Sequence, residues 1–192
     1  TAITYLLPGV VSALRRQHPG LRFFVREAGS SAVADAVLRG ELDLGIVTLP
    51  VRVPGRGDLQ EIPLVDDEMR LIVPAGHALE GRRGFRFRDV ASEAFVAFEA
   101  GSAVRELVDR AAERAGATLS VVMELRSIES IKHMVAASIG IGLVSRFALG
   151  DREGLRCRDD RLVRQLAIVR RADRVPAPGP AEFERMLVQA NA

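Results

Sequence analysis

The stretch RSIESIKHMVAASIGIGLVS, residues Arg126–Ser145, decides the fold class. Its Gly-Ile-Gly resembles the beginning of a dinucleotide-binding loop, but such a loop follows a strand and opens a helix. Here the order is reversed, because apolar residues recur at helical spacing before the glycines and predict a helix from Ser127 to about Ser138. We expect Gly140 to end this helix in a left-handed conformation. Ile141–Val144 is then predicted to be a short buried strand, in which Gly142 permits close packing.

The helix before this strand belongs to a longer unit. Gly101-Ser102 is predicted to open a helix that Gly116 closes, and the strand Leu119–Leu125 leads from it to the quoted stretch. The unit ends in the strand Gly142-Leu-Val-Ser145. Its order is therefore helix, strand, helix, strand.

The same order occurs earlier in the chain and also ends in a hydroxyl, at Gly45-Ile-Val-Thr48. An apolar stripe from Ile3 to Leu14 predicts the first helix, which Pro8 kinks or restarts. The last strand is apolar on both faces at nearly every position, which is typical of the middle of a parallel sheet. A strand, a turn into a helix and this second strand are predicted at Leu21–Ala28, Gly29–Gly40 and Leu42–Leu49.

Two copies of one unit predict an α/β protein with two Rossmann-like lobes. Two crossover strands near residues 73–75 and 167–171 would join them, giving lobe I from 1–74 with 168–192 and lobe II from 75–167. Lobes joined by two short connections can hinge about a crevice. The remaining predicted elements are strands at LQEIPLV and MRLIVPA around Asp66–Glu68, a strand Leu162–Val169 and a terminal helix Pro180–Gln189.

The composition is that of an ordinary globular protein, with 48% hydrophobic and 27% charged residues among 192. No apolar run reaches membrane-spanning length and no basic-then-apolar leader begins the chain, so we expect a cytoplasmic protein. The single cysteine, Cys157, excludes an internal disulfide and a thiol-rich metal site. The net charge is only +2 and the arginines are scattered among acidic residues, so this chain is not expected to bind DNA strongly by itself.

Ligands of parallel α/β lobes bind where strands end and helices begin. Small hydroxyl side chains stand at these predicted positions, and a glycine and an arginine directly precede two of them. Several of the serines are predicted helix N-caps, so capping alone is the simpler interpretation of any one of them. The candidate binding residues are Thr1, Ser30, Ser31, Thr48, Gly101, Ser102, Arg126, Ser127 and Ser145.

Helix N-termini and hydroxyls that converge without a fixed carboxylate suit a small, reversibly bound anion. Such a crevice accepts aromatic acids, amino-acid precursors, sulfate-like anions and sugar phosphates alike. Catalysis is not expected, because His18, His77 and His133 have no partner at ligand or triad spacing. Glu99 and Glu106, an imaginable acid and base, more simply belong to a solvated helix face. Neither a metal site nor a cofactor is predicted.

Five motifs follow one another along the chain: TAITYLLPGVVSALRRQHPGLRFFVREAGSS, LRGELDLGIVT, LIVPAGHAL, FEAGSAVRELVD and SIESIKHMVAASIGIGLVS. In this order they resemble the effector-binding domain of LysR-type transcriptional regulators. The resemblance covers essentially the whole chain and implies a fold like that of type 2 periplasmic binding proteins, with a small-molecule inducer in the crevice. It implies inducer contacts at Thr1, Thr48 and Ser102, with Ser127 and the Ser30/Ser31 turn adjoining.

The chain departs from that family in two ways. The winged helix-turn-helix and linker helix that precede the domain in the family are absent from this chain, so DNA binding is expected outside it. Ser138 stands where the family often has glycine. A homodimer or tetramer is expected, with the first helix packed against the partner's Ser102 helix, whose Val104 and Val108 could also reach outward. The simpler alternative is that these residues only fill the core of each lobe. Two alternatives stay open: a free-standing solute-binding protein, and a bilobal enzyme such as a dehydratase.

Overall fold

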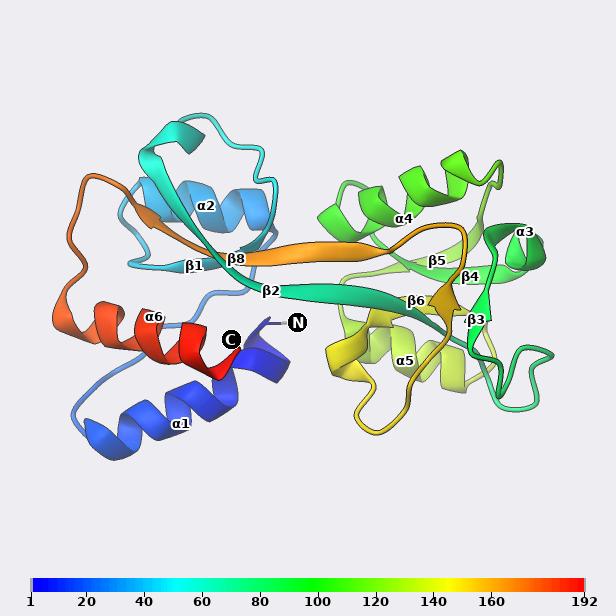
Figure 1. Cartoon of the computed structure of the whole chain (residues 1–192), viewed down its shortest axis with the longest axis horizontal. Helices are drawn as coiled ribbons and strands as arrows, with labels where there is room; N and C mark the ends of the chain where they lie inside the picture. Colours follow the sequence, from blue (N-terminus) through cyan, green and yellow to red (C-terminus); the bar gives the residue numbers. More distant parts are fainter. Residues whose placement is uncertain (1, 192) are drawn as a thin grey trace. The chain divides into compact units, whose positions relative to one another are not determined.

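The computed structural model describes residues 2–191 and consists of two compact units (Figure 1). Unit 1 comprises Thr1–Asp66 and Gln165–Ala192, and unit 2 comprises Asp67–Arg164. Both divisions fall earlier in the chain than the predicted boundaries at 74/75 and 167/168. The first does so because the residues after Asp66 already pair with a strand of unit 2, in a ladder from Met69–Ser145 to Ile72–Gly142.

Two strands, β2 (Leu59–Ile72) and β8 (Val163–Arg171), contain residues of both units. The prediction of two separate strands around Asp66–Glu68 was wrong, since β2 runs through these acidic residues without a break. The strand order is β1-β8-β2-β6, where β1 is Gly45–Thr48 and β6 is Gly142–Ser145.

Unit 1 is built from helices around β1 and its partner strand. The first predicted helix is formed in two parts, a π-helical turn Ala2–Leu6 and α1 (Leu7–Gln17), which restarts at Pro8 as expected. The predicted terminal helix is α6 (Pro178–Ala190), which packs against α1 (Figure 1). The other elements of the unit are α2 (Ser30–Leu38) and a short 3₁₀ helix, η2 (Arg56–Asp58).

Two predictions for unit 1 were wrong. Leu21–Ala28 is not a strand: these residues have no ladder partner in the described part of the chain, and the Phe24 side chain is 78% exposed. The strand β1 does not lie within a parallel sheet, because it pairs antiparallel with β8 from Gly45–Val169 to Thr48–Leu166. Its apolar character has another cause, since α2 packs against it and Gly45 gives Val33 room to approach.

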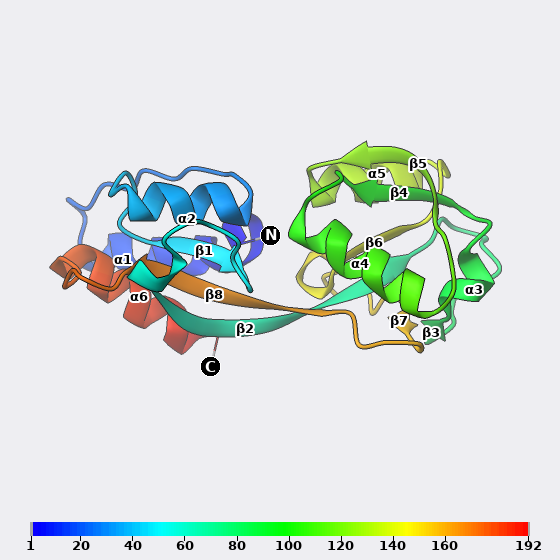
Figure 2. The same cartoon turned by 90° about the horizontal axis from the view of Figure 1, so that it is seen from above.

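Unit 2 contains the quoted stretch and the remaining elements (Figure 2). The predicted helices and strand are α4 (Ala103–Arg114), β5 (Ser120–Leu125) and α5 (Ile128–Ala136), and Gly116 closes α4 in a left-handed conformation as expected. Further elements are β3 (Gly84–Phe85), α3 (Phe87–Val90), β4 (Ala94–Phe98), η3 (Arg146–Ala148) and β7 (Arg156–Cys157).

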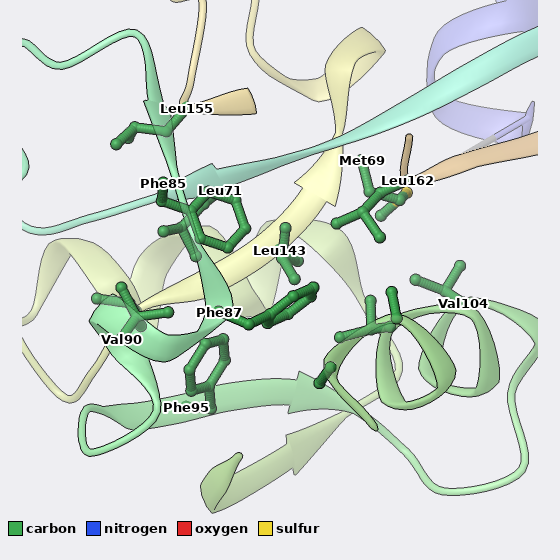
Figure 3. Close-up of a cluster of buried hydrophobic side chains, with 14 residues drawn as sticks. Met69, Leu71, Phe85, Phe87, Val90, Phe95, Val104, Leu143, Leu155 and Leu162 are labelled. Atoms are coloured by element: carbon green, nitrogen blue, oxygen red, sulfur yellow. The ribbon is translucent and has the colours of Figure 1, made fainter. Parts of the chain in front are cut away.

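The core of unit 2 is aromatic at its centre (Figure 3). Phe85 and Phe87 are buried with ring centroids 5.5 Å apart and planes at 82°, an edge-to-face arrangement that aromatic rings favour. Val104 and Val108 of α4 belong to this core and are 5% and 6% exposed. They therefore do not reach outward, and this part of the interface prediction was wrong.

The end of α5 differs from the prediction at one residue. The left-handed residue after the helix is Ser138, with φ 60°, and not Gly140. Gly140 is needed for close approach instead, because a Cβ there would lie 2.2 Å from the carbonyl oxygen of Ala94. Gly142 permits close packing as expected, because a Cβ at this position would lie 2.8 Å from Ile131 Cγ2. No described helix of the chain is both long and apolar enough to cross a membrane.

Candidate functional site

In unit 2 the candidate residues lie at the ends of two paired strands. β4 and β5 run parallel (Figure 2). Their last pair is Phe98 with Leu125. The loops that follow both strands therefore begin side by side, and the Glu99 N–H donates to the Leu125 carbonyl at 3.1 Å. Gly101 is left-handed with φ 79°, a conformation that a residue with a side chain rarely adopts. This turn lets the chain enter α4 at Ser102.

Ser102 and Ser127 are helix N-caps, as predicted. The Ser102 hydroxyl accepts from the Arg105 N–H at 3.2 Å, and the Ser127 hydroxyl accepts from the Ser130 N–H at 3.4 Å. A hydroxyl has one O–H donor besides its acceptor lone pairs. Capping therefore leaves each of these serines able to donate to an anion, next to first-turn N–H groups that have no helical partner.

Carboxylates do lie near these caps, so the expectation that none would was wrong. The Arg126 guanidinium pairs with Glu99 at 2.6 Å, although the Arg126 side chain is 85% exposed. Glu106 and Glu129 stand in the first turns of α4 and α5. Arg126 offsets the charge of Glu99, and its exposed guanidinium retains further N–H donors for a ligand.

The loop before α4 is anchored by a pair that the sequence patterns did not indicate. Glu124 of β5 accepts from Arg105 at 2.7 Å and from the Ala100 N–H at 3.2 Å. Arg105 also donates to Asp109 and to the Phe98 carbonyl. Hydrogen bonding from Arg105, and then from the Ala100 amide, lowers the pKa of Glu124. Burial acts to lower the pKa of Arg105, but its hydrogen bonds to Glu124 and Asp109 outweigh this and raise it.

In unit 1 the structure brings Ser30 and Thr48 together. The Thr48 N–H donates to the Ser30 hydroxyl at 2.9 Å, so the end of β1 is tied to the beginning of α2. Ser30 was predicted as an N-cap, but Gly29 occupies that position and Ser30 is the first helical residue. Ser31 is exposed and Thr48 is 7% exposed. Thr1 lies outside the described residues.

Ser145 differs from the other candidates because it is completely buried. Its hydroxyl donates to Asp67 Oδ1 at 2.7 Å and accepts from the Phe147 N–H at 3.2 Å. Asp67 is also fully buried and pairs with Arg164 at 2.8 Å. These contacts indicate a structural role for Ser145 rather than contact with a ligand.

The described residues contain no group of three or more His, Cys, Asp or Glu side chains placed to hold a metal ion. Both ring nitrogens of His77 have a neighbouring partner: its Nδ1 accepts from the Leu79 N–H at 3.1 Å, and its Nε2 lies 3.5 Å from Glu93. Cys157 is half-buried, and burial raises the pKa of its thiol, which disfavours the nucleophilic thiolate.

Comparison with known proteins gives one consistent match. The family model described as LysR substrate binding domain matches residues 1–192. A probable RuBisCO transcriptional regulator of Chlorokybus atmophyticus is 31% identical over 152 residues, 78% of this chain and 49% of that protein. The corresponding protein of Emiliania huxleyi is 27% identical over 198 residues, 98% of this chain and 63% of that protein. The chain thus spans less than two thirds of these relatives.

Solved structures share the fold over the full chain. The CcmR regulatory domain of Synechocystis PCC6803 in complex with 2-PG superposes with a TM-score of 0.86 at 23% identity, covering 100% of this chain and 93% of that one. The effector-binding domain of QuiR in complex with shikimate gives 0.82 at 16% identity, covering 100% and 92%. The BenM effector-binding domain with benzoate gives 0.81 at 20% identity, covering 98% and 87%. The predicted fold class is confirmed.

Proposed function

This chain belongs to the LysR substrate binding domain family, and we propose that it senses a small anionic effector and relays its binding to DNA-binding domains outside these residues. Relatives and structural neighbours that match it are transcriptional regulators or their effector domains. The proposal places the protein in the cytoplasm, as a homodimer or tetramer without catalytic activity. Effector binding alters affinity for DNA only if it favours one arrangement of the protein over another.

The observation that carries the proposal is the pair of capped helix N-termini after β4 and β5. Ser102 and Ser127 can each donate a hydroxyl proton to a ligand while they cap, and the positively charged Arg126 directly precedes Ser127. Shikimate and benzoate, bound by two of the structural neighbours, are both carboxylates. Both features favour a small acid.

The helix N-termini alone do not provide enough free energy to bind an effector. Two helix N-termini stabilise an anion by at most about 2 kcal/mol together. Binding at about 100 µM requires about 5.5 kcal/mol. The difference must come from hydroxyl and Arg126 hydrogen bonds and from apolar contact, so we expect a reversibly bound effector. That the same ligand also contacts Ser30, Ser31 and Thr48 stays a prediction.

Thermal melts in the presence of small carboxylates, phosphorylated acids, amines and neutral sugars test the proposal. A ligand at a hundred times its Kd stabilises the fold by about 2.7 kcal/mol, a shift of several degrees. We expect acids to produce this shift and amines not to. A best ligand that was cationic would contradict the choice of an anion.

Substitution at Ser102 then tests the site. Ser102→Ala removes both hydroxyl and cap, and should weaken binding of the best acid by more than the loss of about 1 kcal/mol in stability explains. Ser102→Thr keeps the hydroxyl and should bind normally. Ser92, an exposed serine elsewhere in unit 2, provides the matched control Ser92→Ala. Equal affinity in all three variants would mean that the effector binds elsewhere.

A further inference from the structure

Unit 2 contains a cavity of about 420 Å³ that none of the candidate binding residues lines. Its charged lining consists of Arg70, Arg146, Arg152, Arg156 and Glu153, and Phe147 supplies an apolar wall. Four arginines against one glutamate give this lining a formal charge of +3. The volume is within the range of about 300–1,000 Å³ that is common for small-molecule sites.

Arg70 supplies the second observation. Its side chain is only 9% exposed, and one guanidinium nitrogen pairs with Glu68 at 2.9 Å. Its Nε, however, is buried without a hydrogen-bond partner among the described residues. Buried polar groups are nearly always hydrogen-bonded, and an unpaired buried donor is costly. Arg70 therefore brings to the cavity wall a guanidinium whose hydrogen bonds within the chain are incomplete.

The other arginines come from the segment that follows β6: Arg146 from η3, Arg152 from the loop after η3 and Arg156 from β7. The Arg146 guanidinium lies 5.1 Å from the centroid of the Phe147 ring, a cation–π contact, and the Phe147 N–H is fixed by the buried Ser145 hydroxyl. Arg152 and Arg156 are exposed, and neither forms an ion pair with a carboxylate in the described part of the chain. Their guanidinium groups are therefore free to bind an anion.

We propose that this cavity is a second anion site, which binds a small phosphate-bearing molecule such as a phosphate monoester or pyrophosphate. Guanidinium groups bind phosphate oxygens in bidentate fashion, and several of them match a multiply charged anion. A monocarboxylate would leave most of the +3 charge uncompensated. Phe147 offers a surface for a short carbon skeleton attached to the phosphate.

Calorimetric titration of the whole chain with inorganic pyrophosphate tests this site. Arg152→Gln and Arg156→Gln should each raise the Kd about tenfold or more, as expected for the loss of one charge-assisted hydrogen bond. Both arginines are exposed, so the fold should be retained. Arg88→Gln removes an exposed arginine of unit 2 that does not line the cavity and is the matched control; it should leave the Kd unchanged.

Two further binding measurements distinguish this site from the proposed effector site. Ser102→Ala should not change pyrophosphate binding, and acetate should bind at least tenfold more weakly than pyrophosphate. Nitrogen-15 spectra should show the Arg70 Nε–H signal moving on titration, and Arg70→Lys should remove that signal. Absence of pyrophosphate binding, equal Kd values in the cavity variants and the control, or equal binding of acetate would each overturn the proposal.

Discussion

Replacing Ser145 by alanine should reduce the stability of unit 2 without acting on a ligand. The substitution leaves the fully buried Asp67 with one donor fewer and removes the acceptor of the Phe147 N–H. A hydrogen bond to a charged group contributes about 1.5–3 kcal/mol, and a buried group left unpaired costs about 1–3 kcal/mol. Because Arg164 still pairs with Asp67, we expect a loss of about 2–3 kcal/mol in the free energy of unfolding. That corresponds to a fall in Tm of about 4–12 °C for a chain of this size.

Urea and thermal unfolding followed by circular dichroism measure this loss. Ser31 is exposed, so Ser31→Ala is the control and should lie within about 0.5 kcal/mol of the unsubstituted chain. Asp67→Ala should cost more than Ser145→Ala, about 3–5 kcal/mol, because it removes the acceptor of the Ser145 hydroxyl and a carboxylate partner of Arg164. If Ser145→Ala unfolds like Ser31→Ala but no longer binds the best acid, the structural assignment of Ser145 is refuted.

Three other predictions concern acid stability, the end of α5 and assembly. Arg105 lowers the pKa of Glu124 below its ordinary 4.5 in the folded chain, so this contribution to stability is present above that value and is lost as pH falls through the lowered pKa. Glu124→Gln should therefore lose less stability on acidification in melts across acidic pH, and an unchanged pH profile would contradict the pairing. Gly140→Ala should unfold unit 2 because its Cβ would lie 2.2 Å from a β4 carbonyl oxygen, whereas Ser138→Gly should relieve about 1 kcal/mol of left-handed strain and raise the Tm. Light scattering should give the mass of a homodimer, and Val11→Glu on α1 should give a folded monomer; a monomeric parent chain would contradict the first expectation, and an unfolded variant the second.

Local signals in the sequence predicted local structure well. The helical spacing of apolar residues and the hydroxyls at Ser102 and Ser127 located α4 and α5 with their caps, because caps and amphipathic stripes are fixed by neighbours in the chain. Pairings over long sequence distances were not predictable in this way. The acidic residues Asp66–Glu68 suggested a break, yet β2 continues through them because Asp67 is buried against Arg164, 97 residues along the chain.

The wrong predictions for Gly140 and for Leu21–Ala28 have related causes. Gly140 was assigned the left-handed position because glycine adopts it most readily, but the approach of β4 leaves no room for a side chain there, and Ser138 takes the strained conformation. Leu21–Ala28 has the composition of a strand, but a strand requires a partner for its backbone groups. Composition does not specify that partner.

The two copies of the repeated unit end in a hydroxyl, but their hydrogen bonds differ. At the end of β1 it is the backbone of Thr48 that is held, by the side chain of Ser30. At the end of β6 it is the side chain of Ser145 that is held, by the buried Asp67. Thr48 thereby keeps its own hydroxyl for other contacts, while Ser145 has committed both its donor and an acceptor.

This difference follows from the strands that enter unit 2. Asp67 lies on β2, Arg164 on β8 and Ser145 at the end of β6, so the buried cluster joins one residue from each of three strands. Replacing a buried ion pair by apolar residues is often neutral or stabilising, and its clearest use is to fix register. We therefore expect the cluster to set the register of β2 against β6, from Met69–Ser145 onwards, and to hold η3 through the Phe147 N–H. Ser145 and Thr48 match in sequence but not in role, because only Ser145 has a buried carboxylate to satisfy.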